Sequence, residues 1–156
     1  MIEIIKAEEK HVSAIGILWH EFIDFHIDIE PLFIPNDEAE EGFKEEIVRA
    51  LMKSEDGLVL VALDKGQAVG YSIAGIEEPP RGSTRREYGC IHHMAVTESH
   101  RRTGIAEELF EKILKWLQSR GIDRIELDVM SKNSVSNSFW QKQGFAEFQR
   151  RLAREI

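Results

Sequence analysis

Apolar residues recur at every third or fourth position near the start of the chain, which is the spacing of one buried face of an α-helix. This first face comprises Val12, Ile15, Leu18, Trp19, Phe22, Ile23 and His26. A short apolar run at residues 2–5 precedes it and predicts a strand. Pro31 and Pro35 then break the chain, and a second helical face comprises Phe43, Ile47, Leu51 and Met52. The pattern therefore predicts one strand followed by two helices.

Two apolar runs in the middle of the chain have the continuous hydrophobic character of buried strands. They span residues 58–63 and 68–74, and the Asp-Lys-Gly-Gln turn at residues 64–67 joins them as an antiparallel hairpin. A loop-rich stretch at residues 79–83 follows the hairpin. The apolar run at residues 88–96 predicts another strand.

The last third of the chain alternates between helix and strand. A helical face comprises Ala106, Leu109, Phe110, Ile113, Leu114 and Leu117, and the helix ends at Arg120 and Gly121. A strand over residues 125–130, a short helix over 134–143 and a strand-like segment over 145–156 are expected to follow. An antiparallel first half and a later strand–helix–strand unit predict an α/β (α+β) fold with a mixed sheet and a right-handed parallel crossover.

The composition narrows the class of protein. The chain of 156 residues suffices for one domain with a substantial core. A single cysteine excludes a disulfide-stapled secreted scaffold, and no Cys/His spacing suggests a metal site. No apolar stretch approaches the roughly 20 residues of a membrane helix, and no basic leader follows Met1. We expect one cytoplasmic domain that binds neither a membrane nor a metal.

Charge is distributed unevenly along the chain. The net charge is −8, but residues 1–99 carry 9 basic and 20 acidic side chains, whereas residues 100–156 carry 11 and 8. The acidic total argues against a nucleic-acid binder, which needs a basic face. Twelve of the acids lie in residues 21–56. We expect the two halves to meet ligands of opposite charge, although a solvated face of surface helices would have the same composition.

The segment with the most chemical content runs from Met94 to Ala106, where a buried strand leads through a basic turn into a helix. The first turn of a helix has unpaired backbone N–H groups at the positive end of the helix dipole. With Arg101 and Arg102 beside it, such a turn can hold a phosphate or pyrophosphate, and Gly104 lets the ligand approach the backbone closely. A glycine-containing loop with two solvated arginines is the alternative.

The residues of this turn match a known motif. Arg101-x-x-Gly104-x-Ala106 resembles the Q/R-x-x-G-x-G/A signature with which the GNAT N-acetyltransferase superfamily binds the pyrophosphate of acetyl-CoA. Downstream, Asn133-x-x-Ser136-x-x-Phe139-Trp140-x-x-x-Gly144-Phe145 resembles the N-x-x-A-x-x-F/L-Y-x-x-x-G-F element of the same family. The resemblance covers most of residues 58–150 by element order and is strong at both motifs.

The resemblance implies a single N-acetyltransferase domain over residues 1–156, with acceptor-binding helices at about 8–54 and an acetyl-CoA-binding core at about 58–150. It also implies a mostly antiparallel sheet, flanked by helices and splayed between its central fourth and fifth strands, with the pantetheine arm in the gap. The implied cofactor-binding residues are Met94, Ala95, Val96, Arg101, Arg102, Thr103, Gly104, Ile105, Ala106, Asn133, Ser136 and Trp140. Asn133 could equally be the N-cap of the short helix.

Transfer of an acetyl group to an amine requires a neutral amine and a positioned thioester, and backbone donors near Val96 could stabilise the oxyanion. His92 and His93 are the candidate bases, because imidazole titrates near about pH 6.5 and both precede the cofactor-contacting residues. Neighbouring strand residues point to opposite faces, so we expect only one of the two to meet substrate, His92 before His93. Glu87 is a reserve candidate. Either histidine could instead be merely packed against the sheet.

Trp140 stands where the family pattern has a tyrosine, whose hydroxyl is the usual general acid. Indole is not a useful proton donor, so Ser134, Ser136, Tyr88 or water would protonate the thiolate, or no dedicated acid is needed. Core packing is the simpler role for Trp140. Cys90 lies close to the candidate bases, but a lone buried cysteine is usually a small apolar residue.

The acceptor is expected to meet the first two helices, where acidic side chains lie among aromatic ones. Asp24, Asp28 and Glu30 are the candidate substrate-binding residues, and the combination favours a cationic primary amine of a small molecule or peptide. The leading hypothesis is direct acetyl transfer from acetyl-CoA to that amine. A non-catalytic acyl-CoA-binding sensor or partner-binding module, and a phosphate-binding α/β protein, are the alternatives. Apolar residues in segment 145–156 could pair across a subunit boundary, so the sequence leaves a homodimer open.

Overall fold

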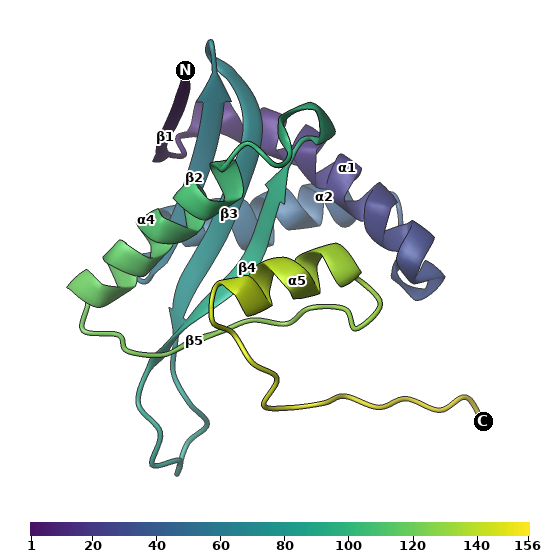
Figure 1. Ribbon diagram of the computed structural model, residues 1–156, viewed down its shortest axis with the longest axis vertical. Coiled ribbons are helices and arrows are strands. Elements are labelled where there is room, and N and C mark those ends of the chain that lie inside the picture. The colour runs from purple at the N-terminus through teal and green to yellow at the C-terminus, as the bar shows by residue number, and fades with distance from the viewer.

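A five-stranded sheet forms the centre of the computed structural model, which describes residues 1–156 (Figure 1). The strands are β1 (Ile2–Lys6), β2 (Gly57–Asp64), β3 (Gln67–Glu77), β4 (Tyr88–Val96) and β5 (Ile125–Glu126), and they lie side by side in this order. The first four strands pair antiparallel, and β5 pairs parallel to β4. The mixed, mostly antiparallel sheet confirms the predicted fold class.

The hairpin between β2 and β3 forms as the sequence predicts. Asp64 pairs with Gln67 across the turn. The two residues between them have positive φ, 51° at Lys65 and 83° at Gly66, which is the backbone geometry of a type I′ turn and matches the twist of the flanking strands.

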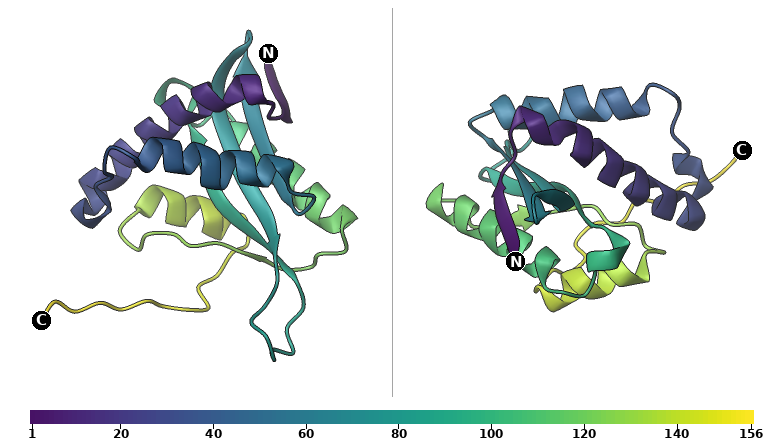
Figure 2. Two further views of the ribbon diagram at one scale, coloured as in Figure 1. Left: turned by 180° about the vertical axis from the view of Figure 1, so that it is seen from behind. Right: turned by 90° about the horizontal axis from the view of Figure 1, so that it is seen from above.

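Helices cover both faces of the sheet (Figure 2). One face carries α1 (Val12–Ile29) and a second helical run made of α2 (Ala39–Gly42), the π-helical segment η3 (Phe43–Arg49) and α3 (Ala50–Lys53). The other face carries α4 (Ile105–Ser119), with α5 (Ser134–Lys142) near β4 and β5. Short 3-10 turns, η1 (Glu9–His11), η2 (Pro31–Phe33) and η4 (Glu98–His100), connect these elements.

The core consists of two hydrophobic clusters, one on each side of the sheet. The predicted helical faces supply much of both. The cluster on the α1 side includes Val12, Ile15, Leu18, Trp19, Phe43, Val48, Tyr71 and Ile73. The cluster on the α4 side includes Leu60, Ala62, Ile105, Leu109, Phe110, Ile113 and Leu117. Removal of this apolar surface from water stabilises the packing of both helical layers on the sheet.

Two of the predicted strands differ from the structure. The strand expected over residues 125–130 pairs with β4 only at residues 125 and 126, because the chain diverges from β4 after that point. The prediction of strand-like structure over 145–156 is wrong: this segment has no regular structure and extends away from the sheet (Figure 1). Its Phe148 and Leu152 side chains are 60% and 84% exposed, and its backbone has no neighbouring strand in the chain to pair with.

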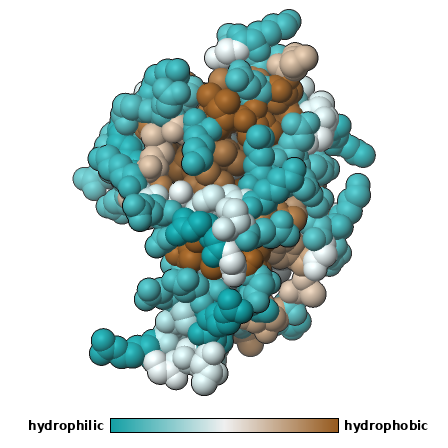
Figure 3. All heavy atoms as spheres, turned by 90° about the vertical axis from the view of Figure 1, so that its left-hand side faces the viewer, coloured by the Kyte–Doolittle hydropathy of each residue, from teal (hydrophilic) through white to brown (hydrophobic).

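The surface on the β1 side is mostly hydrophilic, with hydrophobic side chains visible in the gaps between polar ones (Figure 3). None of the helices combines the length and the apolar character needed to cross a lipid bilayer.

Candidate functional site

The candidate site is a cleft that begins where β4 and β5 diverge. Gly89 pairs with Ile125 and Cys90 with Glu126, and the two chain segments then separate. The cleft has a volume of about 110 Å³. Its lining residues are Phe22, His26, Ile91, His92, His93, Met94, Leu127, Asp128, Val129, Met130, Asn133, Ser136 and Trp140. The sheet is therefore open between its fourth and fifth strands, as expected.

A β-bulge places both candidate histidines of β4 on one side of the sheet. Ile73 pairs with His93 but Ala74 pairs with Ile91, so His92 is the extra residue of the bulge. His93 packs among aromatic rings on the α1 side. His92 Nε2 lies 3.2 Å from where a Cβ on Gly75 would be, on the same side. The expectation that the two side chains point to opposite faces is therefore wrong.

His93 is enclosed by aromatic side chains. Its ring centroid lies 5.1 Å from those of Phe22 and Phe43 and 6.4 Å from that of Tyr71. Its Nδ1 is buried with no hydrogen-bond partner. This burial, together with the nearby His92 and His26, lowers the pKa of His93 to about 4. The imidazole is therefore neutral at neutral pH.

His92 is the more exposed of the two and already has polar neighbours. Its Nε2 lies 3.2 Å from Oε1 of Glu77, and its Nδ1 lies 3.9 Å from Sγ of Cys90. Burial and nearby carboxylates raise the pKa of the Cys90 thiol to about 11. The thiol is therefore protonated at neutral pH, which agrees with its interpretation as a small apolar residue and not a nucleophile.

Glu87 and the three acids of the α1 region lie outside the cleft lining. Glu87 is exposed in the loop before β4, several residues before the bulge. Asp24 and Asp28 are exposed on α1. Glu30 pairs with Lys132 at 3.3 Å and thereby links the end of α1 to the segment before α5. The structure does not bring these four acids together with the histidines, and their roles stay predictions.

The turn between β4 and α4 has the backbone geometry expected of an anion site. Arg102 and Gly104 both have left-handed φ, 60° and 90°. Gly104 is the N-cap of α4 and supplies no side-chain cap, so the first N–H groups of the helix have no acceptor. No atom lies within 4 Å of where a Cβ on Gly104 would be. The open space beside Gly104 and the free amides fit a pyrophosphate held by Arg102, Thr103, Gly104, Ile105 and Ala106.

Glu21 of α1 holds this turn in place, and the sequence analysis did not identify it. Its carboxylate accepts hydrogen bonds from Thr97 Oγ1 at 2.8 Å and from the Glu98 backbone N–H at 2.7 Å. It also pairs with Arg101 Nη2 at 3.3 Å. Arg101 Nε donates to the Val96 carbonyl at 3.0 Å. The Arg101 side chain is therefore engaged within the protein, and its expected contact with the pyrophosphate stays a prediction.

The residues of the second motif lie on the α5 side of the cleft. Asn133 is 2% exposed, and its Oδ1 accepts from the Ser136 backbone N–H at 3.1 Å, so it is the N-cap of α5 as well as a lining residue. Trp140 lies edge-on to Phe110 and Phe145, with centroids 5.8 Å and 5.3 Å away. Trp140 therefore both packs in the core and lines the cleft.

Met94, Ala95 and Val96 are partly buried at the end of β4. Met94 and Val96 pack toward the α4-side core, and Ala95 packs toward the α1-side core. Ile105 is buried at the start of α4 and Thr103 Oγ1 donates to the His100 carbonyl. Of these residues only Met94 also lines the cleft. The other side chains serve the fold, so any contact they have with a ligand would be made by their backbone groups.

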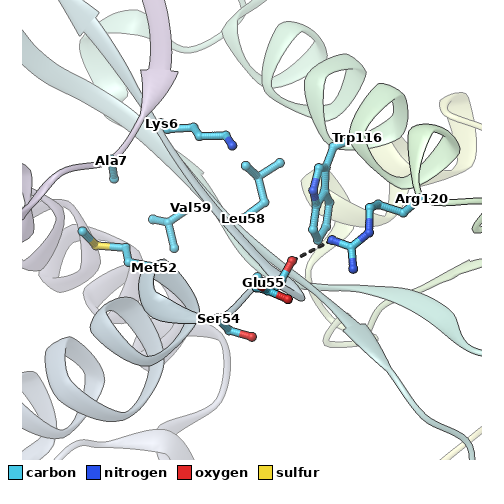
Figure 4. A pocket seen from close by; sticks show the side chains of 10 residues that line it. Lys6, Ala7, Met52, Ser54, Glu55, Leu58, Val59, Trp116 and Arg120 are labelled. Atoms are coloured by element: carbon cyan, nitrogen blue, oxygen red, sulfur yellow. Dashed lines mark hydrogen bonds between the residues drawn. The ribbon is translucent and has the colours of Figure 1, made fainter.

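A larger cavity, of about 310 Å³, lies away from this cleft (Figure 4). It is lined by Lys6, Ala7, Met52, Ser54, Glu55, Gly57, Leu58, Val59, Trp116 and Arg120. Arg120 donates to the Glu55 carbonyl and to Asp56, both at 2.6 Å, and its guanidinium lies 5.9 Å from the Trp116 ring. None of the candidate site residues lines this cavity.

Comparisons with known proteins agree with this architecture. The model of the Acetyltransferase (GNAT) family matches residues 19–145. A streptothricin acetyltransferase from Escherichia coli is 33% identical over 63 residues, which are 40% of this chain and 36% of that protein. The chain spans only 24% and 36% of the lengths of the two curated relatives that it matches.

Solved structures share the whole fold. The tetramutant of the BH1408 protein from Bacillus halodurans has a TM-score of 0.85 at 21% identity, and the match covers 99% of both chains. AAC(6')-Iy in complex with the bisubstrate analogue CoA-S-monomethyl-acetylneamine has a TM-score of 0.74 at 20% identity, covering 100% of this chain and 98% of that chain. At these identities the likeness establishes the fold.

Proposed function

The chain belongs to the Acetyltransferase (GNAT) family, and on that premise we propose that it transfers an acetyl group from acetyl-CoA directly to a primary amine. The observation that carries the proposal is that the cleft beside β4 and the free amides at the start of α4 are connected by one stretch of chain. β4 lines the cleft with residues 91–94, just beyond its last pairing with β5 at Cys90, and the turn after β4 leads to the free amides at the start of α4. One end of an extended ligand can thus be held as an anion while its other end reaches His26, His92 and His93.

Acetyl-CoA, when bound, supplies a thioester-activated acetyl group. In this proposal the amides of residues 102–106 bind its pyrophosphate, and Asn133, Ser136 and Trp140 line the path of its pantetheine arm. The core at about 58–150 would bind the acetyl donor, and the helices at about 8–54 would meet the acceptor. Binding in one fixed geometry would supply much of the rate acceleration.

The acceptor that we propose is a cationic amine of a small molecule or peptide. Acidic side chains lie near the histidines, with Asp128 in the cleft lining and Glu77 beside His92. Asp24 and Asp28 on α1 add negative charge on the α1 side, and Glu30 follows directly after α1, where it pairs with Lys132. Negative charge around an aromatic cleft attracts cationic ligands and raises their rate of association. The bisubstrate complex of AAC(6')-Iy and the streptothricin acetyltransferase supports a search among such amines.

The direct test is thiol release from acetyl-CoA with pooled spermidine, neamine and lysine-containing peptides, alongside calorimetric titration of acetyl-CoA. We expect binding, together with turnover of at least one pool. The matched variant is Gly104→Val, because a β-branched residue at a φ of 90° is strained and fills the space beside the amides. This variant should lose acetyl-CoA binding. Failure of the wild type to bind acetyl-CoA would contradict the proposal.

One observation supports a second function. The indole N–H of Trp140 is too weak an acid to protonate a thiolate, and the aromatic packing around Trp140 is that of a core residue. A non-catalytic acyl-CoA-binding sensor or partner-binding module would keep the cleft and need no acid. Acetyl-CoA binding without turnover of any amine, at donor concentrations that saturate the protein, would favour this second function.

We also propose a homodimer that forms through the segment 145–156. Its Phe148, Leu152 and Ile156 side chains are 60%, 84% and 115% exposed, which is a large apolar surface for an unpaired segment. The outer edge of β5 has no partner strand. Pairing with a second copy would cover both the apolar side chains and the free backbone groups.

A further inference from the structure

His26 is a cleft residue whose hydrogen bond defines which ring nitrogen is free. Its Nδ1 lies 2.8 Å from the Phe22 carbonyl oxygen, one helical turn earlier on α1. A carbonyl oxygen can only accept, so Nδ1 carries the proton of this bond. In the neutral ring the lone pair is therefore on Nε2. No group of the chain hydrogen-bonds to this Nε2.

The ring of His26 is held in place by its neighbours. Its centroid lies 4.1 Å from that of Phe22 and 5.7 Å from that of Phe25. Phe22 also contacts His93, at 5.1 Å, so the Phe22 ring touches both imidazoles. His26 and His93 both line the cleft. A ring fixed by packing and by a backbone hydrogen bond loses little further freedom when it meets a substrate.

The other two histidines of the cleft are less suited to take up a proton from a ligand. His92 Nε2 lies 3.2 Å from the Glu77 carboxylate, and its Nδ1 lies 3.9 Å from the Cys90 thiol. Both of its nitrogens therefore already have a polar neighbour within the protein. His93 is enclosed by aromatic rings, and its charged form would be buried without a counter-charge.

We infer that Nε2 of His26 accepts the proton that the acceptor must lose, so that His26 is a catalytic residue of the reaction proposed above, on which this inference rests. An N–H bond of the ammonium breaks, and its proton moves to Nε2. The electron pair left on nitrogen forms the N–C bond. The C–S bond of the thioester breaks, and sulfur keeps the two electrons of that C–S bond as a thiolate. A second proton leaves nitrogen for the thiolate, and His26 returns its own proton to water.

Charged and titratable groups from β4, from α1 and from the segment after β5 surround the place of this step. From β4, His92 and His93 face the same cleft, and from the segment after β5, Asp128 does. Asp128 adds a negative charge to the cleft that His26 lines, and the neutral His93 adds no positive charge there at neutral pH. On α1 itself Asp24 and Asp28 lie two residues before and two residues after His26, and both are exposed.

The test compares the wild type with His26→Gln and with the control His20→Gln, using the amine pool that the wild type acetylates. His20 lies on the same helix but pairs with Glu40 outside the cleft. We expect His26→Gln to lower kcat/KM by about 100-fold at pH 7, the lower end of what a general base contributes. The defect should shrink to less than about 10-fold at pH 9, because more of the free amine is then already neutral. Acetyl-CoA affinity should not change.

A second measurement does not depend on turnover of any amine. Nitrogen-15 NMR of the imidazoles in the unliganded protein, assigned through His26→Gln, should show His26 as the Nδ1–H tautomer. Observation of the Nε2–H tautomer would overturn the inference, as would a His26→Gln variant within threefold of wild type at pH 7. A defect that is the same at all pH values would also overturn it, since it would indicate a structural role. If the wild type acetylates no amine in any pool, the result counts against the proposed function. The NMR spectrum would still decide the tautomer of His26.

Discussion

At the scale of single residues, the buried imidazole of His93 makes the stability of the folded protein depend on pH. The unfolded ring titrates near pH 6.5, and burial lowers its pKa in the folded protein to about 4. The unfolded chain therefore binds more protons between these two pH values, so acidification through this range favours unfolding. The contribution of the neutral ring to stability is complete above pH 6.5 and is lost as the pH falls to 4.

We expect His93→Phe to remove this pH dependence, because phenylalanine fits an aromatic enclosure and does not titrate. The difference of about 2.5 pKa units corresponds to about 3 kcal/mol. Urea unfolding at pH 7.5, 6.0 and 4.5 should show the wild type losing up to that much more stability than the variant. Parallel stability curves for the two proteins would contradict the assignment of a neutral, buried His93.

Trp140 offers a second test at this scale, because its packing and any catalytic role can be separated. We expect Trp140→Phe to lower the free energy of unfolding by about 1 kcal/mol, since phenylalanine fills less of the space beside Phe110 and Phe145. With the amine that the wild type uses, kcat should stay within about fivefold, because indole does not donate a proton at neutral pH. A drop of a hundredfold in kcat with unchanged stability would show that the tryptophan acts directly in the reaction.

At the scale of secondary-structure elements, Glu21 connects α1 to the turn before α4. One carboxylate holds Thr97, Glu98 and Arg101. The free amides at the start of α4 follow in the same turn. Glu21 is thus a positioning residue for the expected pyrophosphate site, since it acts through the turn and has no place in the cleft lining.

We expect Glu21→Gln to raise the Kd for acetyl-CoA by about three- to tenfold, because one uncharged amide oxygen replaces two charged acceptors. The matched control is Glu46→Gln, an exposed acid of η3 with no ion pair or hydrogen bond in the structure. Titration calorimetry of both variants measures the effect. Equal affinities in the two variants would indicate that the turn keeps its shape without Glu21.

At the scale of the whole molecule, the proposed homodimer depends on the segment 145–156. If two copies pair through it, replacement of its apolar side chains by polar ones should separate them. We expect the wild type to sediment as a dimer and the double variant Phe148→Ser, Leu152→Ser as a monomer with an unchanged circular dichroism spectrum. The control Val135→Ser alters an exposed side chain of α5, 71% exposed, outside the segment. A wild type that stays monomeric at 100 μM would contradict the proposed dimer.

The sequence by itself determined the elements whose periodicity is strong. The apolar positions of α1 and α4 predicted the faces that pack on the sheet, because burial of one helical stripe requires that spacing. The hairpin at Lys65 and Gly66 follows from turn chemistry. The motif at Arg101 to Ala106 indicated an anion site at a helix N-terminus, since Gly104 and the free amides are local features of the chain.

Only the tertiary structure decided what depends on contacts between distant residues. The bulge at His92 interrupts the alternation of side chains between the two faces of the sheet. It arises from the pairing of β4 with β3. The sequence signal for His26 was its place on the buried face of α1, but its position in one cleft with His93 required the folded chain. Glu21 contacts residues 76 to 80 positions away. Periodicity and motifs report local geometry, whereas the neighbours of a side chain are set by how the elements pack.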